Sequence, residues 1–429
     1  MVATTELPRI EVDQQVGHQA DQQVGQQVSQ RTDHQVGRRA QDQTADRPRP
    51  RLALLDGLRL VAALAVVLFH WTAWHHDHWG RHGEPAAEAW PWLSQFSSVG
   101  ALGVQLFFII SGFVILLSSY GKSPARFIGS RVGRLYPAYW VAVLATSTLT
   151  FVLWPEMGTQ RSPADIPANL TMFQGGLGVG HIDGVYWTLW VEMKFYLWIL
   201  AFTLIGMTVG RVLVFAFAWP ILGNALYFGL HAAGQPIGWV EHVFFPQYSA
   251  LFAGGMALFL LFKFGHTPLR WAAFVLNAGA GSLWSARAQQ AETVKLTGYD
   301  YPFWAFVAIV VGLFVLVALI VLTPLASLRV PGMTLAGQLT YPVYLLHQLW
   351  GWWLISLLSP YLPREVVLVL TLAAILGAAW LLHRWVERPL GPGLQRAVTA
   401  GVGTLPVVGR RLGRARTPVS RGSSDVRRS

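Results

Sequence analysis

Two ionisable residues interrupt a long apolar run, Arg59 and His70 in "LLDGLRLVAALAVVLFHW". They are eleven residues apart, and at about 100° per residue a helix brings both side chains to one face, about 16 Å apart along its axis. Ionisable residues in a membrane helix are costly and usually face a protein interior or a water-filled cavity. The pair therefore indicates a reaction site. The alternative is that Arg59 anchors the helix at the membrane interface and His70 packs in the core.

The composition indicates that a membrane surrounds these residues. The 429-residue chain is 53% hydrophobic and 12% charged, whereas about a quarter of the residues of a soluble domain are charged. It has no cysteine, which excludes disulfides, thiolate metal sites and a cysteine acyl-enzyme. The net charge of +11 arises from basic residues in the polar tails and between the apolar runs. This pattern favours membrane orientation over nucleic-acid binding.

Ten apolar runs are long enough to cross about 30 Å of hydrocarbon as helices. We predict spans at 58–75, 99–118, 135–154, 186–206, 211–230, 247–264, 269–285, 302–322, 339–359 and 365–385. Most basic residues lie on the side of the chain ends, so the positive-inside rule predicts that both termini are cytoplasmic. The expected fold class is an all-α polytopic membrane protein.

Polar segments flank these spans. Residues 1–50 repeat "DQQVG" and its variant "DHQVG" and carry few large apolar side chains, so we expect a disordered tail. Residues 51–390 form the predicted transmembrane domain. Residues 391–429 are rich in Arg, Gly and Ser, and we expect a second disordered, basic tail.

Five motifs in order give the domain a family resemblance. They are "LDGLRLVAALAVVLFH", "GALGVQLFFIISGFVI", "FIGSRVGRLYPAYW", "WTLWVEMKFYL" and "TYPVYLLHQ". Together they resemble the acyltransferase 3 family over roughly residues 52–390. The resemblance implies a ten-helix integral membrane enzyme that takes an acyl group from cytoplasmic acyl-CoA and transfers it to a hydroxyl, commonly on a sugar.

Ester transfer requires a base for the acceptor hydroxyl, and His70 is the best candidate because an imidazole titrates near neutral pH. Alternatively, His70 accepts the acyl group covalently and relays it. Glu192 lies at a similar depth in its helix and is predicted to orient His70; the alternative is an ion pair with Lys194 or a nearby arginine. Met-Lys follows Glu192 where many family members have Glu-Gln.

Cationic residues are predicted to hold the donor. Arg131 and Arg134 are three residues apart and share a helix face at the start of the third span, and Arg59 lies at the same side of the membrane. Guanidinium groups bind phosphate oxygens bidentately, so we assign these three residues to acyl-CoA. The alternative is that Arg131 and Arg134 only fix topology and touch lipid phosphates.

The remaining candidates concern the acceptor. We assign His347, Tyr344 and Gln105 to the acceptor site, while helix packing stays an alternative for His347. The loop "HHDHWGRH", residues 75–82, could bind a metal, but we expect a solvated histidine cluster and no metal site. We also expect no tightly bound cofactor, and acetyl-CoA or another short-chain acyl-CoA as co-substrate.

Two other functions remain open. An anionic-solute transporter or flippase would also use Arg59, Arg131 and His70, although the internal repeat typical of transporters is absent. A non-catalytic member of the family is the other alternative. If the chain is an enzyme, its acceptor is an envelope glycan, a lipid-linked sugar or a glycosylated natural product such as a macrolide. We expect a multi-pass protein of a bacterial plasma membrane.

Overall fold

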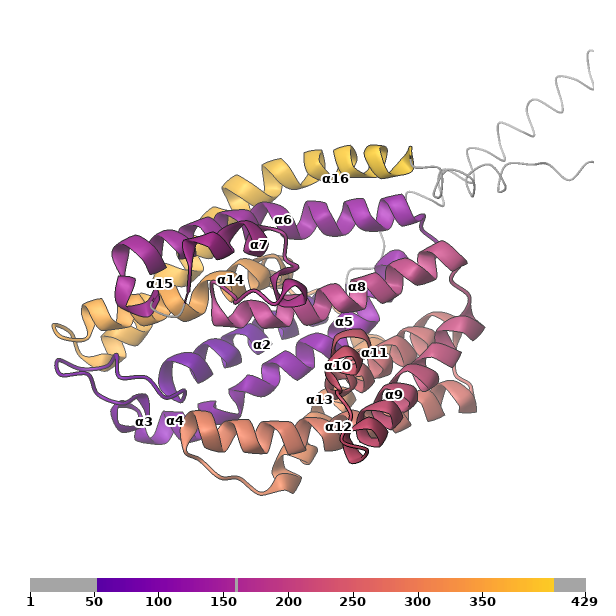
Figure 1. The fold of residues 1–429 in the computed structure, drawn as a ribbon, viewed down its shortest axis with the longest axis horizontal. Coiled ribbons are helices and arrows are strands. Elements are labelled where there is room, and N and C mark those ends of the chain that lie inside the picture. The colour runs from indigo at the N-terminus through magenta and orange to yellow at the C-terminus, as the bar shows by residue number, and fades with distance from the viewer. Residues whose placement is uncertain (1–51, 159–160, 405–429) are drawn as a thin grey trace, which may run out of the picture. The chain divides into compact units, whose positions relative to one another are not determined.

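The computed structural model describes residues 52–158 and 161–404, and these residues form an all-α structure, as predicted (Figure 1). Within these residues, Trp79 and Glu84 form an isolated antiparallel β-bridge. The α-helices are α2 (Ala53–Thr72), α3 (Ala86–Ala89), α4 (Pro91–Ser97), α5 (Gly103–Ser119), α6 (Pro124–Thr148), α7 (Ile166–Leu170), α8 (Trp187–Ile205), α9 (Val209–Ala232), α10 (Gly238–Val243), α11 (Pro246–Phe264), α12 (Pro268–Thr297), α13 (Phe303–Leu322), α14 (Met333–Leu358), α15 (Arg364–Leu382) and α16 (Arg388–Gly403).

Eight helical segments of the described chain are long and apolar enough to cross a membrane. They contain α2, α5, α6, α8, α9, α11, α13 and α15. The other two predicted spans, 269–285 and 339–359, coincide with α12 and α14. These are long helices, of 30 and 26 residues, but they are not among the eight. The ten-span count and the cytoplasmic termini therefore stay predictions.

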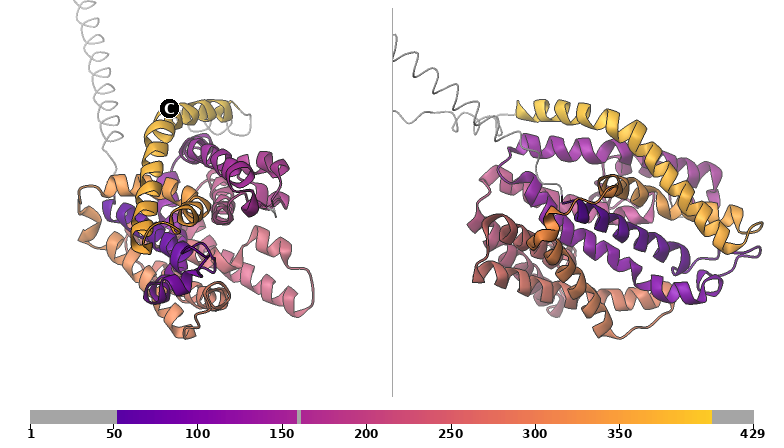
Figure 2. Two further views of the ribbon diagram at one scale, coloured as in Figure 1. Left: turned by 90° about the vertical axis from the view of Figure 1, so that its left-hand side faces the viewer. Right: turned by 180° about the vertical axis from the view of Figure 1, so that it is seen from behind.

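The helix α2 lies at the centre of the arrangement that carries the predicted site. It packs against α14 on one side and α5 on the other. In Figure 1, α6 and α16 run along one edge of the bundle, and α9, α12 and α13 lie at the opposite edge; the reverse view in Figure 2 agrees. The helix α8 contacts both α5 and α6. The motifs that suggested the family thus converge on one group of helices.

Glycines let α5 approach its neighbours closely. A Cβ atom on Gly103 would lie 2.5 Å from the carbonyl oxygen of Ala62 in α2. On the other side, a Cβ atom on Gly255 of α11 would lie 2.9 Å from the backbone nitrogen of Phe113 in α5. Small residues at such contacts allow helix backbones to pack tightly without the help of a hydrophobic effect. The helix α5 is therefore fixed from both sides.

The third span starts earlier than predicted. We expected it to begin near residue 135, but α6 begins at Pro124, where Ser123 caps the helix by accepting a hydrogen bond from the backbone N–H of Arg126. Proline is favoured at the first turn because its missing N–H is not needed there. Arg131 and Arg134 consequently lie inside α6, about two and about three turns from its start.

The prediction that the tail is disordered from residue 391 is wrong for its first part, because α16 continues to Gly403. Packing against α6 explains the difference: a Cβ atom on Gly133 would lie 2.6 Å from the carbonyl oxygen of Gly391. The Arg, Gly and Ser content suggested disorder, but composition does not show that a segment packs against another helix. The predicted tails at 1–50 and beyond residue 404 lie outside the described residues.

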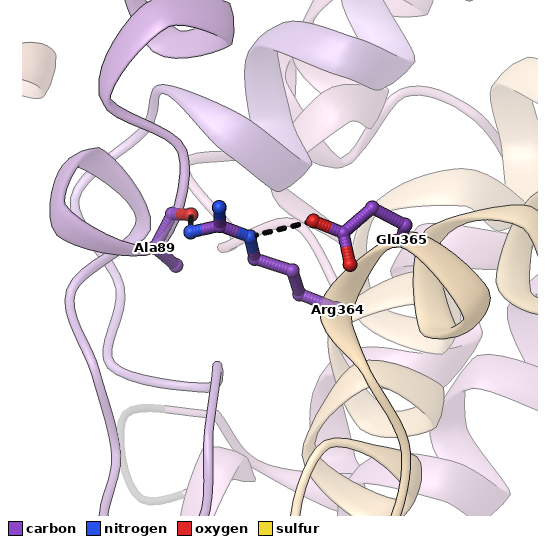
Figure 3. A network of polar contacts seen from close by, with 3 residues as sticks. All are labelled: Ala89, Arg364 and Glu365. Atoms are coloured by element: carbon purple, nitrogen blue, oxygen red, sulfur yellow. Dashed lines mark hydrogen bonds and ion pairs between the residues drawn. The ribbon is translucent and has the colours of Figure 1, made fainter.

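The loop after α2 is tied to the start of α15. Arg364 donates one hydrogen bond to the carbonyl oxygen of Ala89 and another to Glu365 Oε1, the second at 2.9 Å (Figure 3). Its guanidinium also lies 5.3 Å from the ring centre of Trp90. These contacts connect the start of α15 to the end of α3.

Candidate active site

Two neighbouring pockets meet at a polar cluster made by Arg59 of α2, Ser111 of α5 and Glu192 of α8. Ser111 Oγ donates a hydrogen bond to Glu192 Oε1 at 2.9 Å. These three residues and Tyr341 line both pockets. We call the two pockets the arginine pocket and the central pocket. The two pockets therefore adjoin at these four residues.

The arginine pocket contains all three predicted donor-binding residues. It has about 400 Å³ of empty space, including open solvent. Its lining consists of Arg59, Ile110, Ser111, Val114, Ile115, Arg131, Arg134, Leu135, Glu192, Tyr196 and Tyr341. Arg131 donates to Ser118 Oγ at 3.2 Å and lies over the Tyr196 ring. Its Nε is buried without a hydrogen-bond partner among the described residues, so this guanidinium has donor capacity left for a ligand.

The central pocket extends from the polar cluster toward α14. It has about 480 Å³ of empty space, including open solvent, and its lining is mainly apolar. The lining residues are Arg59, Val104, Phe107, Phe108, Ser111, Thr188, Leu189, Glu192, Thr340, Tyr341 and Tyr344. The hydroxyl of Tyr344 accepts a hydrogen bond from Thr188 Oγ1 at 2.8 Å. Tyr344 also touches His347, with ring centres 5.4 Å apart, so one residue of the pocket lining is in contact with this histidine.

His70 and His347 form a buried pair beyond Tyr344. The Nδ1 atom of His70 lies 3.2 Å from Nε2 of His347 and 2.8 Å from the carbonyl oxygen of Val66. The Nδ1 atom of His347 lies 2.9 Å from the carbonyl oxygen of Tyr344. His70 is 6% exposed and His347 is fully buried. We call these two residues the histidine pair.

Tryptophans hold the histidine pair in place. Trp352 Nε1 donates to the backbone carbonyl of His70, and Trp71 Nε1 donates to the backbone carbonyl of His347, both at 2.8 Å. The Trp74 ring stacks on His70 with ring centres 5.1 Å apart. Indole N–H groups buried in this way need such partners. Both imidazoles are therefore held by their backbone as well as by their rings.

Glu192 does not contact His70, contrary to the prediction that it orients this imidazole. It bonds to Ser111 instead, and His347 occupies the position beside His70. The alternative partner Lys194 donates to the carbonyl oxygen of Glu241 in α10. The prediction relied on the similar depths of Glu192 in α8 and His70 in α2. Similar depth does not determine whether the two side chains face each other.

The predicted acceptor residues lie in different surroundings. Tyr344 lines the central pocket and His347 belongs to the histidine pair. Gln105 is buried in α5, and its Oε1 has no hydrogen-bond partner among the described residues. It lines neither of the two pockets. The structure therefore brings Tyr344 and His347 together and leaves Gln105 apart.

The loop histidines are packed rather than solvated as a cluster, so this expectation is wrong for part of the loop. His76 is 8% exposed and stacks on His78. Burial lowers the pKa of His76 to about 3 and also lowers the pKa of His78. Both rings are therefore neutral at physiological pH and contribute to packing near Trp352. In the described part of the chain no group of three or more His, Cys, Asp or Glu side chains could hold a metal ion.

Sequence analysis missed Ser111, Tyr341 and Trp352. Ser111 interrupts the apolar run "FFIISGFVI", and a polar residue inside a span is a signal that could have identified it. Tyr341 lies in the motif "TYPVYLLHQ" beside Tyr344 and His347, and this position could have identified it. Trp352 had no distinguishing signal, because the chain contains 20 tryptophans and only the fold identifies the one that bonds to His70.

Several known proteins are similar to this chain in sequence. The family model described as "Acyltransferase domain" matches residues 52–384. Similar relatives include "Nodulation protein 10" of Rhizobium leguminosarum bv. viciae, 32% identical over 33% of this chain and 41% of that protein. Another is "O-acetyltransferase OatA" of Staphylococcus aureus, 31% identical over 27% of this chain and 17% of that protein. "Exopolysaccharide production protein ExoZ" of Rhizobium meliloti is 45% identical over 10% of this chain and 15% of that protein.

The matched region spans less than half the length of each of these three relatives. No solved structure matches the chain significantly. The family match is far longer and covers the helices that carry the arginine pocket, the central pocket and the histidine pair. The chain belongs to the acyltransferase 3 family.

Proposed function

We propose that the protein transfers an acyl group from acyl-CoA to a hydroxyl of a sugar. The observation that carries this proposal is the order of the polar groups. The arginine pocket shares lining residues with the central pocket, and Tyr344 of the central pocket touches the histidine pair. A donor with phosphates at one end and a reactive thioester at the other fits this order.

The phosphates of coenzyme A bind to Arg59, Arg131 and Arg134 in this proposal. Guanidinium groups make bidentate, charge-assisted hydrogen bonds with phosphate oxygens. The free Nε of Arg131 supports such a contact. The pantetheine arm then extends through the central pocket, whose mainly apolar lining suits it. Acetyl-CoA or another short-chain acyl-CoA acts as a co-substrate, and no cofactor needs to stay bound.

His70 acts on the acceptor hydroxyl. As the hydroxyl oxygen forms its bond to the acyl carbon, its proton passes to a ring nitrogen of His70. The carbon–sulfur bond breaks, and the departing thiolate takes the proton to give coenzyme A. In the alternative route, the same nitrogen attacks the thioester first, the carbon–sulfur bond breaks and the coenzyme A thiolate leaves. The acyl group then passes from the imidazole to the hydroxyl, and the thiolate takes the hydroxyl proton. Glu192 is proposed to tune the cationic pocket rather than to touch His70.

The acceptor is proposed to be a cell-envelope glycan, a lipid-linked sugar or the sugar of a natural product such as a macrolide. The names of two relatives support this class: one is an O-acetyltransferase and another is an exopolysaccharide production protein. A bacterial plasma membrane with both chain ends in the cytoplasm is the location that suits a cytoplasmic acyl-CoA donor.

An assay with purified protein in nanodiscs tests the proposal. Labelled acetyl-CoA is supplied with and without a panel of sugars, and both free coenzyme A and the acylated sugar are measured. We expect sugar-dependent release by the wild type and none by His70→Ala. If no acceptor or acyl-CoA gives release, while vesicles containing the protein accumulate a labelled organic anion, the transporter alternative replaces the proposal.

Sealed vesicles test the side from which the donor binds. Inside-out vesicles should consume added acyl-CoA, whereas right-side-out vesicles should do so only after they are permeabilised. Equal consumption by intact vesicles of both orientations would refute donor binding from the cytoplasm.

A further inference from the structure

The ring nitrogens of the histidine pair carry an inference that rests on the proposed function and refines it. We propose that His347 is a positioning residue that fixes the tautomer of His70. In this arrangement, neutral His347 accepts a hydrogen bond from Nδ1–H of His70 and leaves Nε2 of His70 as the reacting nitrogen. His347 therefore acts through His70 and does not bind the acceptor.

The tautomer of His347 follows from its backbone contact. A carbonyl oxygen only accepts hydrogen bonds, so the nitrogen that lies 2.9 Å from the Tyr344 carbonyl carries a proton. This nitrogen is Nδ1. In the neutral ring Nε2 then has the lone pair. His347 thus offers an acceptor toward His70.

The tautomer of His70 follows in the same way. Its Nδ1 lies 2.8 Å from the carbonyl oxygen of Val66 and 3.2 Å from Nε2 of His347. Both neighbours are acceptors, so Nδ1 carries the proton and shares it between them. The opposite tautomer would point the Nδ1 lone pair at two acceptor atoms in a buried site, and unmade buried hydrogen bonds are costly. The lone pair of neutral His70 is therefore on Nε2.

The surroundings prevent the pair from rearranging easily. The two rings meet edge to face with centres 5.0 Å apart. Trp71 and Trp352 bond to the backbone carbonyls of the pair. Rotation of either ring would break the buried hydrogen bond between its own Nδ1 and a carbonyl oxygen. A fixed hydrogen bond at one ring nitrogen commonly selects the tautomer of a functional histidine.

A neutral partner suits the reaction. When Nε2 takes the proton of the acceptor hydroxyl, His70 becomes an imidazolium, and its Nδ1–H bond to His347 becomes charge-assisted and stronger. His347 stays neutral and no proton leaves the pair. If His70 carries the acyl group instead, the group is attached to the same Nε2 atom. The assignment of His347 is therefore the same for both routes.

Two substitutions of similar size test the inference. In His347→Gln the amide oxygen can reach the position of Nε2 and accept from His70, whereas in His347→Asn the shorter amide reaches only the position of Nδ1. We expect kcat to fall at least tenfold in His347→Asn and to recover most of its value in His347→Gln. The KM values for acyl-CoA and sugar should change less than twofold in both variants.

Several outcomes would overturn the assignment. A rise in the KM for the sugar with unchanged kcat would return His347 to the acceptor site. Equal kcat in the two variants, whether high or low, would remove the role of its Nε2 atom. Donor affinity measured by calorimetry serves as the folding control, because the arginine pocket does not include His347.

A second measurement does not depend on activity. In protein labelled with ¹⁵N-histidine, nitrogen chemical shifts distinguish a protonated from an unprotonated ring nitrogen, and His70→Gln identifies the His70 signals. We expect a protonated Nδ1 and an unprotonated Nε2 in the wild type. A protonated Nε2 with an unprotonated Nδ1 would refute the inference even if the transfer reaction is confirmed. The expected tautomer in a protein that transfers no acyl group would instead refute only the proposed function.

Discussion

The arginine pocket and the histidine pair are built in opposite ways. In the arginine pocket, cations from different helices line an open space, and Arg131 keeps an unused donor atom. In the histidine pair, ring nitrogens and backbone carbonyls bond to each other and to tryptophans, and both side chains are buried. One region has spare hydrogen-bonding capacity and the other has little.

This difference corresponds to two physical requirements. A large, highly charged donor needs a site that exchanges its hydration for charge-assisted hydrogen bonds and lets the product leave. A base needs a fixed geometry, because small displacements of a reacting group slow the reaction strongly. Substitutions in the arginine pocket should therefore change donor affinity, and substitutions around the histidine pair should change the rate of transfer.

Removal of the His70 imidazole should have the largest effect. In His70→Ala we expect kcat to fall by about 100-fold or more, which is the contribution of a positioned base. Donor affinity should stay within twofold, because His70 does not line the arginine pocket. Transfer is followed by coenzyme A release and donor affinity by calorimetry. His82→Gln, in the exposed part of the loop, is the matched control; full activity of His70→Ala would end the proposed role of His70.

Removal of both guanidinium groups of α6 should have the next largest effect. Charge-assisted hydrogen bonds contribute about 1.5–3 kcal/mol each, so the KM for acyl-CoA should rise at least about tenfold in Arg131→Ala/Arg134→Ala. The KM for the sugar should change little. Arg126→Ala is the control, because Arg126 is exposed on the same helix and lines neither pocket. Unchanged donor kinetics in the double variant would leave these arginines with a topological role only.

The sequence predicted the arginine pocket better than the histidine pair. Arginines at a spacing of three on a helix share a face wherever that helix packs, so the grouping of Arg131 and Arg134 needed only local geometry. The contact of His70 with His347 joins α2 and α14, which are 277 residues apart in the chain at this point. Depth in the membrane was predictable for Glu192, but the direction in which it faces depends on how α8 packs. Helix rotation is a tertiary property that periodicity alone does not give.

The same reasoning explains the outcome for the fold. Long apolar runs identify helices because a backbone inside a membrane must satisfy its own hydrogen bonds. Asn277 and several glycines interrupt the apolar run of the predicted span 269–285, yet α12 is a continuous helix of 30 residues. In the structure Asn277 is satisfied by the carbonyl oxygens of Ala216 and Ala273. A polar residue was thus compatible with the helix once a neighbouring helix supplied an acceptor.

A smaller effect should follow loss of a tryptophan bond to the histidine pair. Trp352→Phe removes the donor to the His70 carbonyl, and a single buried hydrogen bond contributes about 0.5–1.5 kcal/mol. We expect kcat to fall roughly 3- to 10-fold, with donor KM unchanged. Trp350→Phe is the matched control, because Trp350 Nε1 has no hydrogen-bond partner among the described residues. Equal kcat in both variants would show that the pair does not need this support.

The smallest effect should arise from the packing of α16 on α6. A Cβ atom on Gly391 would lie 2.8 Å from the carbonyl oxygen of Gly133, whereas one on Gly393 would meet nothing within 4 Å. In α6, Arg131 is about 200° around the helix from Gly133. A larger side chain at position 391 that displaces α6 at Gly133 should therefore also move the Arg131 guanidinium on the opposite face.

Gly391→Val should therefore raise the KM for acyl-CoA by a few fold and leave kcat at saturating donor unchanged, and Gly393→Val should change neither. Steady-state kinetics with varied donor, together with thermal unfolding of each variant, measure this effect. A fall in kcat with unchanged KM in Gly391→Val would mean that α16 supports the histidine pair. Substitutions near the arginine pocket would then no longer act on donor affinity alone.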